Sequence, residues 1–341
     1  MNKPRFCLEV WGNDYNRIRD TCLSAEKLGY YGFFYGESLT DLDLDCWTVL
    51  SALVPLTKTI KLGPVITYIN PSYRSLALVA KQSITFQDIS KGRLEFRTGA
   101  GAASEYSESW WVPYGIDYPK SHTRVSMLEE GLYLFLKFIG RTDLNDFEKS
   151  NGHLPNSNKS NEKKPIGLGD TIYYNGTYFS ADGASMAKPC KNIPITIAAK
   201  SKRMLQIAAN YADIWESSYM TPTQFSSANR KFDDILQSKG NTALLAVKNN
   251  SRSVPKKSIE LDVIITESDK ELEKKKSILA KERGPLAYKQ VLQRGLVGTP
   301  SEIQTRVSKY VDMGAEQFLL AFQDPLDTTS IELFMKSIKV M

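Results

Sequence analysis

The sequence alternates short apolar runs with longer segments of helical periodicity, and this pattern occurs eight times. The runs have the length of buried strands, and the segments between them repeat apolar residues every third or fourth position. No two runs are joined by the short turn that marks a hairpin. The predicted strands are residues 6–10, 31–35, 60–67, 94–98, 194–198, 212–216, 259–266 and 316–322. The predicted helices are residues 15–28, 44–56, 72–89, 121–139, 201–210, 222–238, a charged segment from 269, 299–313 and 328–338.

Eight consecutive β-α units predict an α/β fold, a parallel (β/α)8 barrel (TIM barrel) wrapped by helices. A doubly wound open sheet is the alternative. We expect residues 1–341 to form a single domain. Residues 141–170 interrupt the pattern after the fourth helix with a polar stretch. Such a stretch cannot bury enough surface to order itself, so we expect a mobile insertion there, with a functional lid as the alternative.

Charge and composition argue against several functions. The 44 Lys and Arg exceed the 38 Asp and Glu by six, without a basic stripe interleaved with aromatic residues, so we expect no nucleic-acid partner. Four cysteines without a CxxC pair and two histidines argue against zinc. Asp41, Asp43 and Asp45 resemble part of a calcium loop, but Cys46 replaces the required glycine and Ala52 the final glutamate. We therefore expect no metal.

The N-terminal residues contain no apolar signal segment, and no run of eighteen apolar residues occurs in the chain. These features predict a soluble, cytoplasmic protein without a membrane partner.

In a parallel barrel the active site lies at the carboxyl ends of the strands. Glu9, Glu37 and Glu105 each close a different predicted strand or its loop, so we predict that these three candidate catalytic residues converge on one mouth. Glu9 should point into the barrel, because its neighbours in the strand would face the helices. A carboxylate there is costly unless it is functional or paired, for example with Arg97.

Two loops could hold an anion or a flat ring. The first loop, Ala198-Ala199-Lys200-Ser201, immediately precedes a predicted helix, and Arg203 lies nearby. The free N–H groups at the start of such a helix attract phosphate. A plain helix capped by Ser201 is the alternative. The second loop, Gly99-Ala100-Gly101, allows close approach of the backbone, but it lacks the third glycine of a dinucleotide fingerprint.

Aromatic side chains near the predicted mouth could wall a pocket for a flat cofactor or a small-molecule substrate. The candidate substrate-pocket residues are Trp11, Tyr35, Ser38, Trp110 and Trp111. The two adjacent tryptophans could equally pack a loop or contact a second subunit.

Short segments over nearly the whole chain match one family in order and spacing. They are Ala25–Tyr30, Asp45–Leu50, Thr59–Gly63, Tyr73–Gln82, Asp88–Leu94, Gly99–Gly101 with Glu105-Tyr106, Arg124 with Leu128–Leu132, Ser201–Met204, Ala208–Asp213 and Val297–Pro300. With these segments the sequence resembles the luciferase-like monooxygenase superfamily, which includes oxidoreductases dependent on the deazaflavin coenzyme F-420.

The resemblance implies a barrel with an insertion, reduced FMN or coenzyme F-420 at the strand ends, and usually a homodimer. It also implies a bulge with a non-proline cis peptide at Ile66, Thr67 and Tyr68, pressed against the cofactor ring. It favours a monooxygenase that uses reduced FMN on a small organic substrate. The alternatives are an F-420-dependent dehydrogenase or reductase that transfers hydride, and a flavin-binding protein without turnover.

Some relatives place Asp-His after the second strand, with the histidine as base, whereas this chain has Glu37-Ser38. A sugar-phosphate dehydrogenase is therefore in doubt. Because no nicotinamide site is recognised, reduced cofactor would come from a separate flavin reductase.

The three glutamates receive different expected roles. Glu9 beside an apolar ring would have a raised pKa and could transfer protons near neutral pH. Glu37 would orient the ring or substrate, and Glu105 would position the cofactor loop. The rival interpretation makes all three structural partners of arginines such as Arg74, Arg93 or Arg97.

Overall fold

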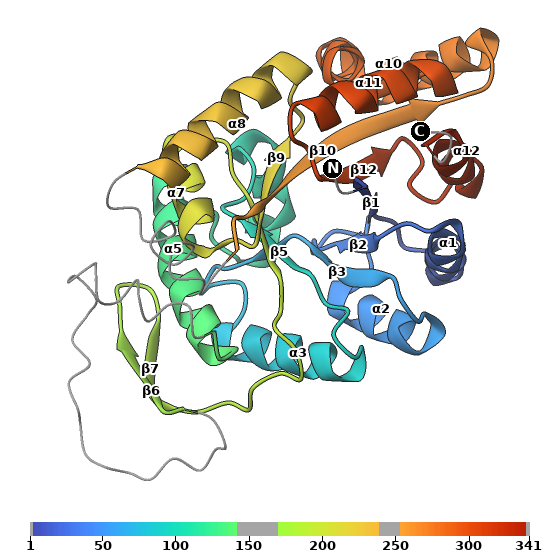
Figure 1. Cartoon of the computed structure of the whole chain (residues 1–341). Coiled ribbons are helices and arrows are strands. Elements are labelled where there is room, and N and C mark those ends of the chain that lie inside the picture. Colours follow the sequence, from blue (N-terminus) through green and yellow to red (C-terminus); the bar gives the residue numbers. More distant parts are fainter. Residues whose placement is uncertain (1–2, 142–169, 239–252, 339–341) are drawn as a thin grey trace.

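Short strands rich in branched and aromatic residues lie in parallel at the centre of the molecule (Figure 1). The computed structural model describes residues 3–141, 170–238 and 253–338. The strands of the central sheet are β1 (Arg5–Val10), β2 (Gly32–Gly36), β3 (Lys61–Val65), β4 (Thr67–Tyr68), β5 (Phe96–Gly99), β8 (Ile195–Ala198), β9 (Ile214–Ser218), β10 (Lys256–Ile265), β11 (Leu296–Gly298) and β12 (Gln317–Phe322).

The sheet closes on itself. Its strand order is β3-β2-β1-β12-β10-β9-β8-β5-β4, with β11 paired to β10. The segments β3 and β4 are two parts of one predicted strand, separated by a cis peptide bond between Val65 and Ile66. Leu62 of β3 bridges Leu94 beside β5, and β4 pairs with β5. With β3 and β4 counted as one strand and β11 left aside, these are the eight strands of the predicted (β/α)8 barrel, and the fold class is confirmed.

Helices surround the barrel, and several begin and end at capping residues. They are α1 (Tyr15–Leu28), α2 (Cys46–Leu53), α3 (Leu76–Ile89), α4 (Ser104–Ser107), α5 (Ser121–Phe138), α7 (Lys202–Tyr211), α8 (Pro222–Gln237), α10 (Asp269–Arg294), α11 (Pro300–Asp312) and α12 (Thr328–Ile338), with 3-10 turns η1 (Val54–Leu56), η2 (Glu108–Trp110) and η3 (Val112–Tyr114). Asp14 accepts from the first amides of α1, which ends at Gly29 with φ of 90°. Both features match the start and stop expected of a helix.

The barrel interior is partly polar. Arg97 is fully buried, donates to Glu95 and pairs with Glu216. Its guanidinium also lies over the Phe34 ring, 4.4 Å from the ring centroid. Phe34 points inward with Cys7, so its neighbours in β2 pack between the barrel and the helices.

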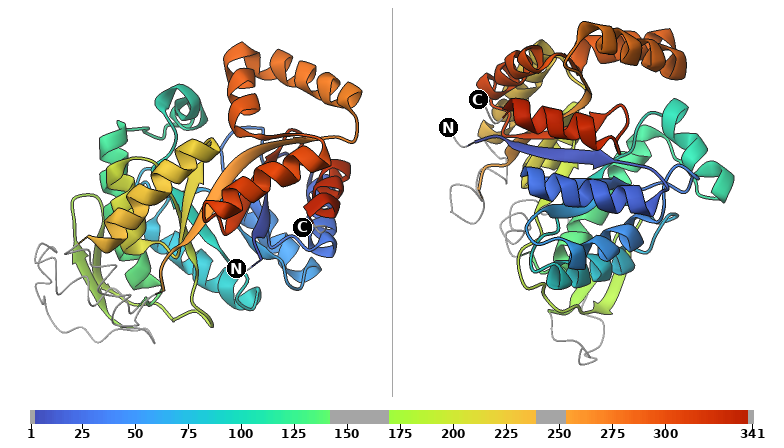
Figure 2. Two further views of the ribbon diagram at one scale, coloured as in Figure 1. Left: turned by 45° about the horizontal axis from the view of Figure 1, so that its top comes forward. Right: turned by 90° about the vertical axis from the view of Figure 1, so that its right-hand side faces the viewer.

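The hairpin before β8 and the break within the helix that begins at Asp269 were not predicted. A hairpin precedes β8, formed by β6 (Ile172–Asn175) and β7 (Ser180–Ala184). Helix α10 is broken at Gly284, where φ is 76° and Pro285 follows. It projects beside the barrel (Figure 2) and has its own apolar cluster, which comprises Ile264, Leu272, Leu279 and Val291.

The predicted insertion at 141–170 lies almost wholly outside the described residues. Within the described ranges, none of the helices combines the length and the hydropathy needed to cross a membrane.

Candidate functional site

Three small or apolar residues meet at the carboxyl ends of neighbouring strands. Ile66 follows β3, Gly99 ends β5 and Ala198 ends β8. A Cβ built on Gly99 would lie 3.2 Å from Cδ1 of Ile66 and 3.4 Å from Cβ of Ala198. The three residues are therefore closely packed, and we call them the apolar floor. The cis peptide implied by the resemblance is present immediately before Ile66.

Glu9 lies among carboxylates of β10. Glu9 and Asp262 both pair with Ala321 of the intervening strand β12. Burial and the neighbouring Glu260, which shares a hydrogen bond with Glu9, raise the pKa of Glu9 well above its usual range. Oε2 of Glu9 has no hydrogen-bond partner in the described chain. The charge of the neighbouring carboxylate therefore favours the protonated form of Glu9.

Aromatic and cationic groups surround this pair. The Tyr219 hydroxyl hydrogen-bonds to Glu260, which contributes to raising the pKa of Tyr219, although burial is the larger cause. The Arg294 guanidinium lies 4.8 Å from the centroid of the Tyr219 ring. Asp262 accepts from Arg283 at 3.1 Å and faces Arg294 at 4.0 Å. The buried acidic pair therefore lies beside Tyr219 and Asp262, and Asp262 is paired with two arginines.

Sequence reasoning missed the β10 carboxylates, although a signal was present. Ser258, Glu260 and Asp262 alternate with apolar residues in one strand, which is the pattern of a strand with one polar face. Arg97, named as a possible partner of Glu9, instead pairs with Glu95 and Glu216, so that expectation was wrong.

Glu37 belongs to a separate buried network. Its carboxylate accepts from Oγ1 of Thr67 at 2.6 Å and from the hydroxyl of Tyr73 at 3.1 Å. Arg74 forms an ion pair with it at 2.8 Å. Burial raises the pKa of Glu37, while Arg74 opposes that shift. Glu37 thereby fixes Thr67 of β4, directly beyond the apolar floor.

The loop after β5 is held from outside the barrel by Arg124 of α5. Arg124 donates to the carbonyl of Ala100 at 2.8 Å and to that of Ala102 at 2.7 Å. Between them Gly101 has φ of 81°, which favours glycine. Sequence reasoning quoted Arg124 only as part of a family block. Glu105 is exposed on α4 beyond this loop, and no contact joins it to Glu9 or Glu37 among the described residues.

The start of α7 also faces the mouth. Ser201 caps the helix by accepting from the amide of Met204 at 3.3 Å. The pKa of Lys200 is lowered, mainly by burial, while the charge of Glu260 opposes that shift. Ala199 is buried beside Lys200. Arg203, expected near a phosphate, pairs with Glu129 at 2.9 Å.

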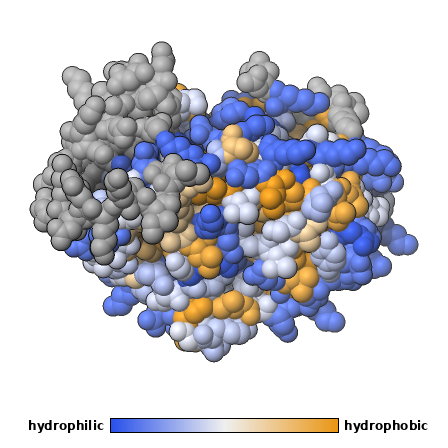
Figure 3. Space-filling model, turned by 90° about the horizontal axis from the view of Figure 1, so that it is seen from below, coloured by the Kyte–Doolittle hydropathy of each residue, from blue (hydrophilic) through white to orange (hydrophobic). Residues whose placement is uncertain are grey.

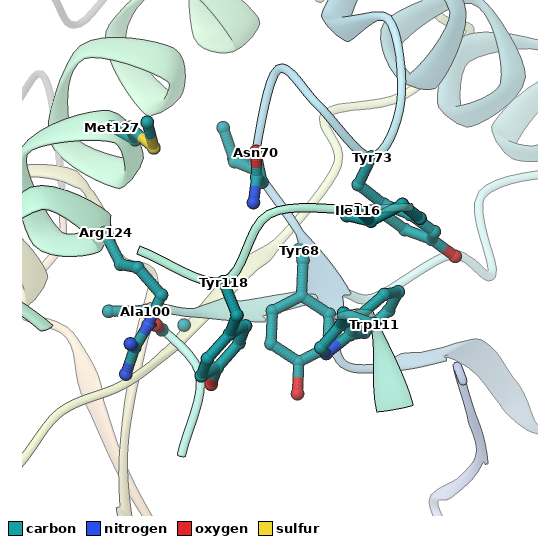
Figure 4. A pocket seen from close by; sticks show the side chains of 11 residues that line it. Tyr68, Asn70, Tyr73, Ala100, Trp111, Ile116, Tyr118, Arg124 and Met127 are labelled. Carbon is teal, nitrogen blue, oxygen red and sulfur yellow. The ribbon is translucent and has the colours of Figure 1, made fainter. Parts of the chain in front are cut away.

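A pocket lies beside the ends of β4 and β5 (Figure 4). Trp111 is buried within its wall, with its ring centroid 4.7 Å from that of Tyr68 and 4.5 Å from that of Tyr73. The lining residues are Tyr68, Ile69, Asn70, Tyr73, Gly99, Ala100, Trp111, Ile116, Tyr118, Arg124 and Met127. Of the predicted substrate-pocket residues, Trp111 lines this pocket.

The other predicted pocket residues lie elsewhere. Tyr35 points away from the mouth because the neighbouring Phe34 occupies the inward position; its hydroxyl donates to the carbonyl of Gly12 and accepts from the amide of Leu44. Ser38 donates to a neighbouring aspartate in the loop after β2. Trp11 and Trp110 are half-buried and line no part of this pocket.

Metal ligands are not gathered at the mouth. No group of three or more His, Cys, Asp or Glu side chains suited to a metal occurs in residues 3–141, 170–238 and 253–338.

Comparison with known proteins identifies the family to which the chain belongs. Residues 5–317 match the model of the luciferase-like monooxygenase family. The chain is 27 % identical over 194 residues to a 5,10-methylenetetrahydromethanopterin reductase of Archaeoglobus fulgidus, a match over 57 % of this chain and 47 % of that protein. The chain thus spans about half the length of this curated relative.

Solved structures share the fold. An F-420-dependent secondary alcohol dehydrogenase, in complex with an F-420–acetone adduct, has a TM-score of 0.75 at 17 % identity, over 99 % of this chain and 98 % of that one. The oxygenating constituent of 3,6-diketocamphane monooxygenase from Pseudomonas putida, in complex with FMN, has a TM-score of 0.69 at 15 % identity, over 98 % of both chains.

Proposed function

This chain belongs to the luciferase-like monooxygenase family, and from that premise we propose that it is an oxidoreductase that uses reduced FMN to oxygenate a small organic substrate. Coenzyme F-420-dependent hydride transfer is the second candidate, supported by the F-420-dependent alcohol dehydrogenase of the same fold and by the methanopterin reductase relative. The observations that carry the proposal are the apolar floor at the ends of β3, β5 and β8 and the buried acidic pair of β1 and β10.

The residues present fit a flat ring system. Ile66, Gly99 and Ala198 offer a surface without polar side chains at the strand ends. A side chain at Gly99 would fill this space, whereas glycine leaves it open. FMN or coenzyme F-420, when bound, supplies the redox chemistry. The chain would hold the ring on the floor, with Thr67 and Tyr68 beside it.

The loops after β5 and β8 would hold the rest of the cofactor. Gly101 and Ala100 bring backbone close to the mouth, and Arg124 fixes their conformation. The amides at the start of α7, with Lys200, favour a phosphate. Arg203 would act through its ion pair with Glu129 rather than as a direct ligand.

Glu9 would hold the proton that the reaction needs. Burial and Glu260 raise the pKa of its carboxyl, which favours the protonated form, and a protonated carboxyl can serve as a general acid. Glu37 is engaged by Thr67, Tyr73 and Arg74, so its role would be to orient the floor. Glu105 would position the cofactor loop from α4.

Titration with each cofactor tests the proposal. The purified protein should quench the fluorescence of FMN, of F-420, or of both on saturable binding. FMN preference supports the monooxygenase, and F-420 preference supports hydride transfer. If neither cofactor binds, the proposal is wrong. If either cofactor binds but the protein turns over none of the substrates tested, a non-catalytic flavin-binding protein is favoured.

We also propose that two copies associate through the face formed by α2, η1 and α3. Leu56, Leu78 and Ile89 are 44 %, 51 % and 52 % exposed on these elements, and apolar groups are visible on the side of the molecule that includes α3 (Figure 3). Leu78→Glu should dissociate a dimer in sedimentation experiments. The matched control is Leu286→Glu on α10, which should leave association unchanged. A dimer that survives Leu78→Glu contradicts this interface.

Three further expectations stay predictions. They are a separate flavin reductase as partner, a cytoplasmic location, and one domain over residues 1–341. Limited proteolysis tests the last: a first cut near residue 190 or 240 that releases stable halves would contradict it.

A further inference from the structure

We propose that Arg74 is a positioning residue of the cofactor site: by supplying the counter-charge of Glu37, it fixes the hydroxyl of Thr67 in β4. The inference rests on the proposed function only in assigning this strand end to the cofactor.

Arg74 lies in the turn between β4 and α3. The turn begins at Asn70, whose carbonyl accepts from the amides of Tyr73 and Arg74. The side chain of Arg74 is 15 % exposed, and that of Glu37, its ion-pair partner, is 2 % exposed. The carboxylate is therefore removed from water, where a charge is costly unless it is paired and hydrogen-bonded.

The groups around Glu37 are all donors. Its Oε2 accepts from Oγ1 of Thr67 at 2.6 Å. Its Oε1 accepts from the hydroxyl of Tyr73 at 3.1 Å and lies 2.8 Å from Nη2 of Arg74. Arg74 also donates to the Tyr73 hydroxyl at 3.3 Å, so that hydroxyl keeps its own proton for Glu37. An ionised carboxylate offers acceptors only, and it therefore matches all three donors.

Arg74 maintains this arrangement through its charge. Among the described residues, no other cation forms an ion pair with Glu37. Burial and the charge of Asp45 raise the pKa of Glu37, and Arg74 opposes that shift. Without Arg74 the protonated carboxyl would be favoured, and its O–H is itself a donor. One of the hydroxyls of Thr67 and Tyr73 would then lose its acceptor and turn away.

Thr67 connects this network to the cofactor site. Its side chain is fully buried, and its carbonyl accepts from Oγ1 of Thr98 at 2.7 Å. It lies between Ile66 of the apolar floor and Tyr68. A change at its hydroxyl therefore acts on the immediate neighbours of both residues.

A second contact ties the same turn to β4. The ring centroid of Tyr73 lies 4.5 Å from that of Trp111, which lies 4.7 Å from that of Tyr68 (Figure 4). The turn thus supports β4 by an ionic route through Glu37 and by an aromatic route through Trp111. Thr67→Val separates the two routes, because it removes the hydroxyl and leaves the aromatic contacts in place.

The protein without cofactor tests the coupling between Arg74 and Thr67. Methyl NMR of threonine-labelled protein reports the side-chain rotamer of Thr67, whose signal is identified by its loss in Thr67→Val. We expect one rotamer in the unaltered protein and rotamer averaging in Arg74→Met. The double variant Arg74→Met with Glu37→Gln should recover the single rotamer, because glutamine needs no counter-charge. An unchanged single rotamer in folded Arg74→Met overturns the proposal.

Titration with FMN and with F-420 tests the effect on the site. Thr67→Val removes one hydrogen bond, so we expect the affinity to fall by about twofold to tenfold and the absorbance spectrum of the bound cofactor to shift. Arg74→Met should weaken binding at least as much. A matched control is Lys257→Met, which breaks an ion pair with Asp233 at the amino end of β10; this lysine is 16 % exposed. It should leave affinity and spectrum unchanged.

The outcomes separate this proposal from the proposed function. Equal affinities and spectra for Thr67→Val and the unaltered protein overturn it, even where Arg74→Met fails to fold. A loss of affinity in Lys257→Met equal to that in Arg74→Met also overturns it, since any lost ion pair would then suffice. If the unaltered protein binds neither cofactor, the proposed function is contradicted, and the rotamer of Thr67 still decides whether Arg74 positions it.

Discussion

Replacement of Arg97 by methionine should destabilise the barrel strongly. The Arg97 side chain is fully buried, and its partners Glu95 and Glu216 are 1 % and 2 % exposed. Methionine would leave two carboxylates inside the barrel without their counter-charge. Breaking one buried ion pair in this way typically costs about 3–5 kcal/mol. Because the two carboxylates share one cation, their contributions are not additive, and we apply this range once.

The expected loss can be converted into a melting temperature. With an unfolding entropy of about 2.1 cal/mol/K per residue, a chain of 341 residues has a total of roughly 0.7 kcal/mol/K. A loss of about 3–5 kcal/mol then lowers the melting temperature by roughly 4–7 °C.

Urea unfolding followed by circular dichroism measures this loss. The control is the triple variant Arg97→Met, Glu95→Gln and Glu216→Gln, which removes the stranded charges and should recover most of the stability. A loss below about 1 kcal/mol in the single variant, or no recovery in the triple variant, would refute the reasoning.

Other substitutions test the mouth. Burial and Glu260 raise the folded-state pKa of Glu9, so the stability that Glu9 contributes is present below the unfolded-state pKa and is lost as pH rises through the raised value. Glu9→Gln should therefore lose less stability than the unaltered protein as pH rises from about 4.5. Urea-unfolding free energies that change in parallel with pH for the two proteins would contradict this. Gly101→Ala should weaken cofactor binding in fluorescence titrations, because φ is 81° and the new Cβ would lie 2.5 Å from the Tyr118 hydroxyl; equal affinities would contradict it. Lys200→Glu should weaken FMN or F-420 binding by roughly ten- to a hundredfold, and an unchanged dissociation constant would place the phosphate elsewhere.

The barrel was predictable because its strands and helices carry local signals. Strands covered by helices read as apolar runs, and Asp14 and Gly29 fix the ends of α1 at the predicted residues 15–28. The helix predicted from residue 72 begins later, at Leu76. Asn70 explains the difference, since its side chain and carbonyl bind the amides of the next residues in a turn.

The site was predictable only in part because side-chain partners depend on tertiary structure. Strand alternation predicts an inward Glu9, and the structure places it beside Glu260. Tyr35 was predicted as a pocket residue only because it lies at the end of a strand. Strand alternation places its neighbour Phe34 inward, so Tyr35 points outward. No spacing in the sequence indicates that Arg203 pairs with Glu129, 74 positions away.

Helix α10 follows a barrel strand yet packs on its own apolar cluster, which includes Leu272 and Leu279. Mutations of the apolar residues of this helix would therefore alter a satellite cluster rather than the main core. Selection against destabilisation acts chiefly on the part that sets the stability threshold. We therefore expect the apolar positions of α10 to tolerate sequence change better than the barrel core, whereas Arg283 and Arg294 stay constrained by Asp262 and Tyr219.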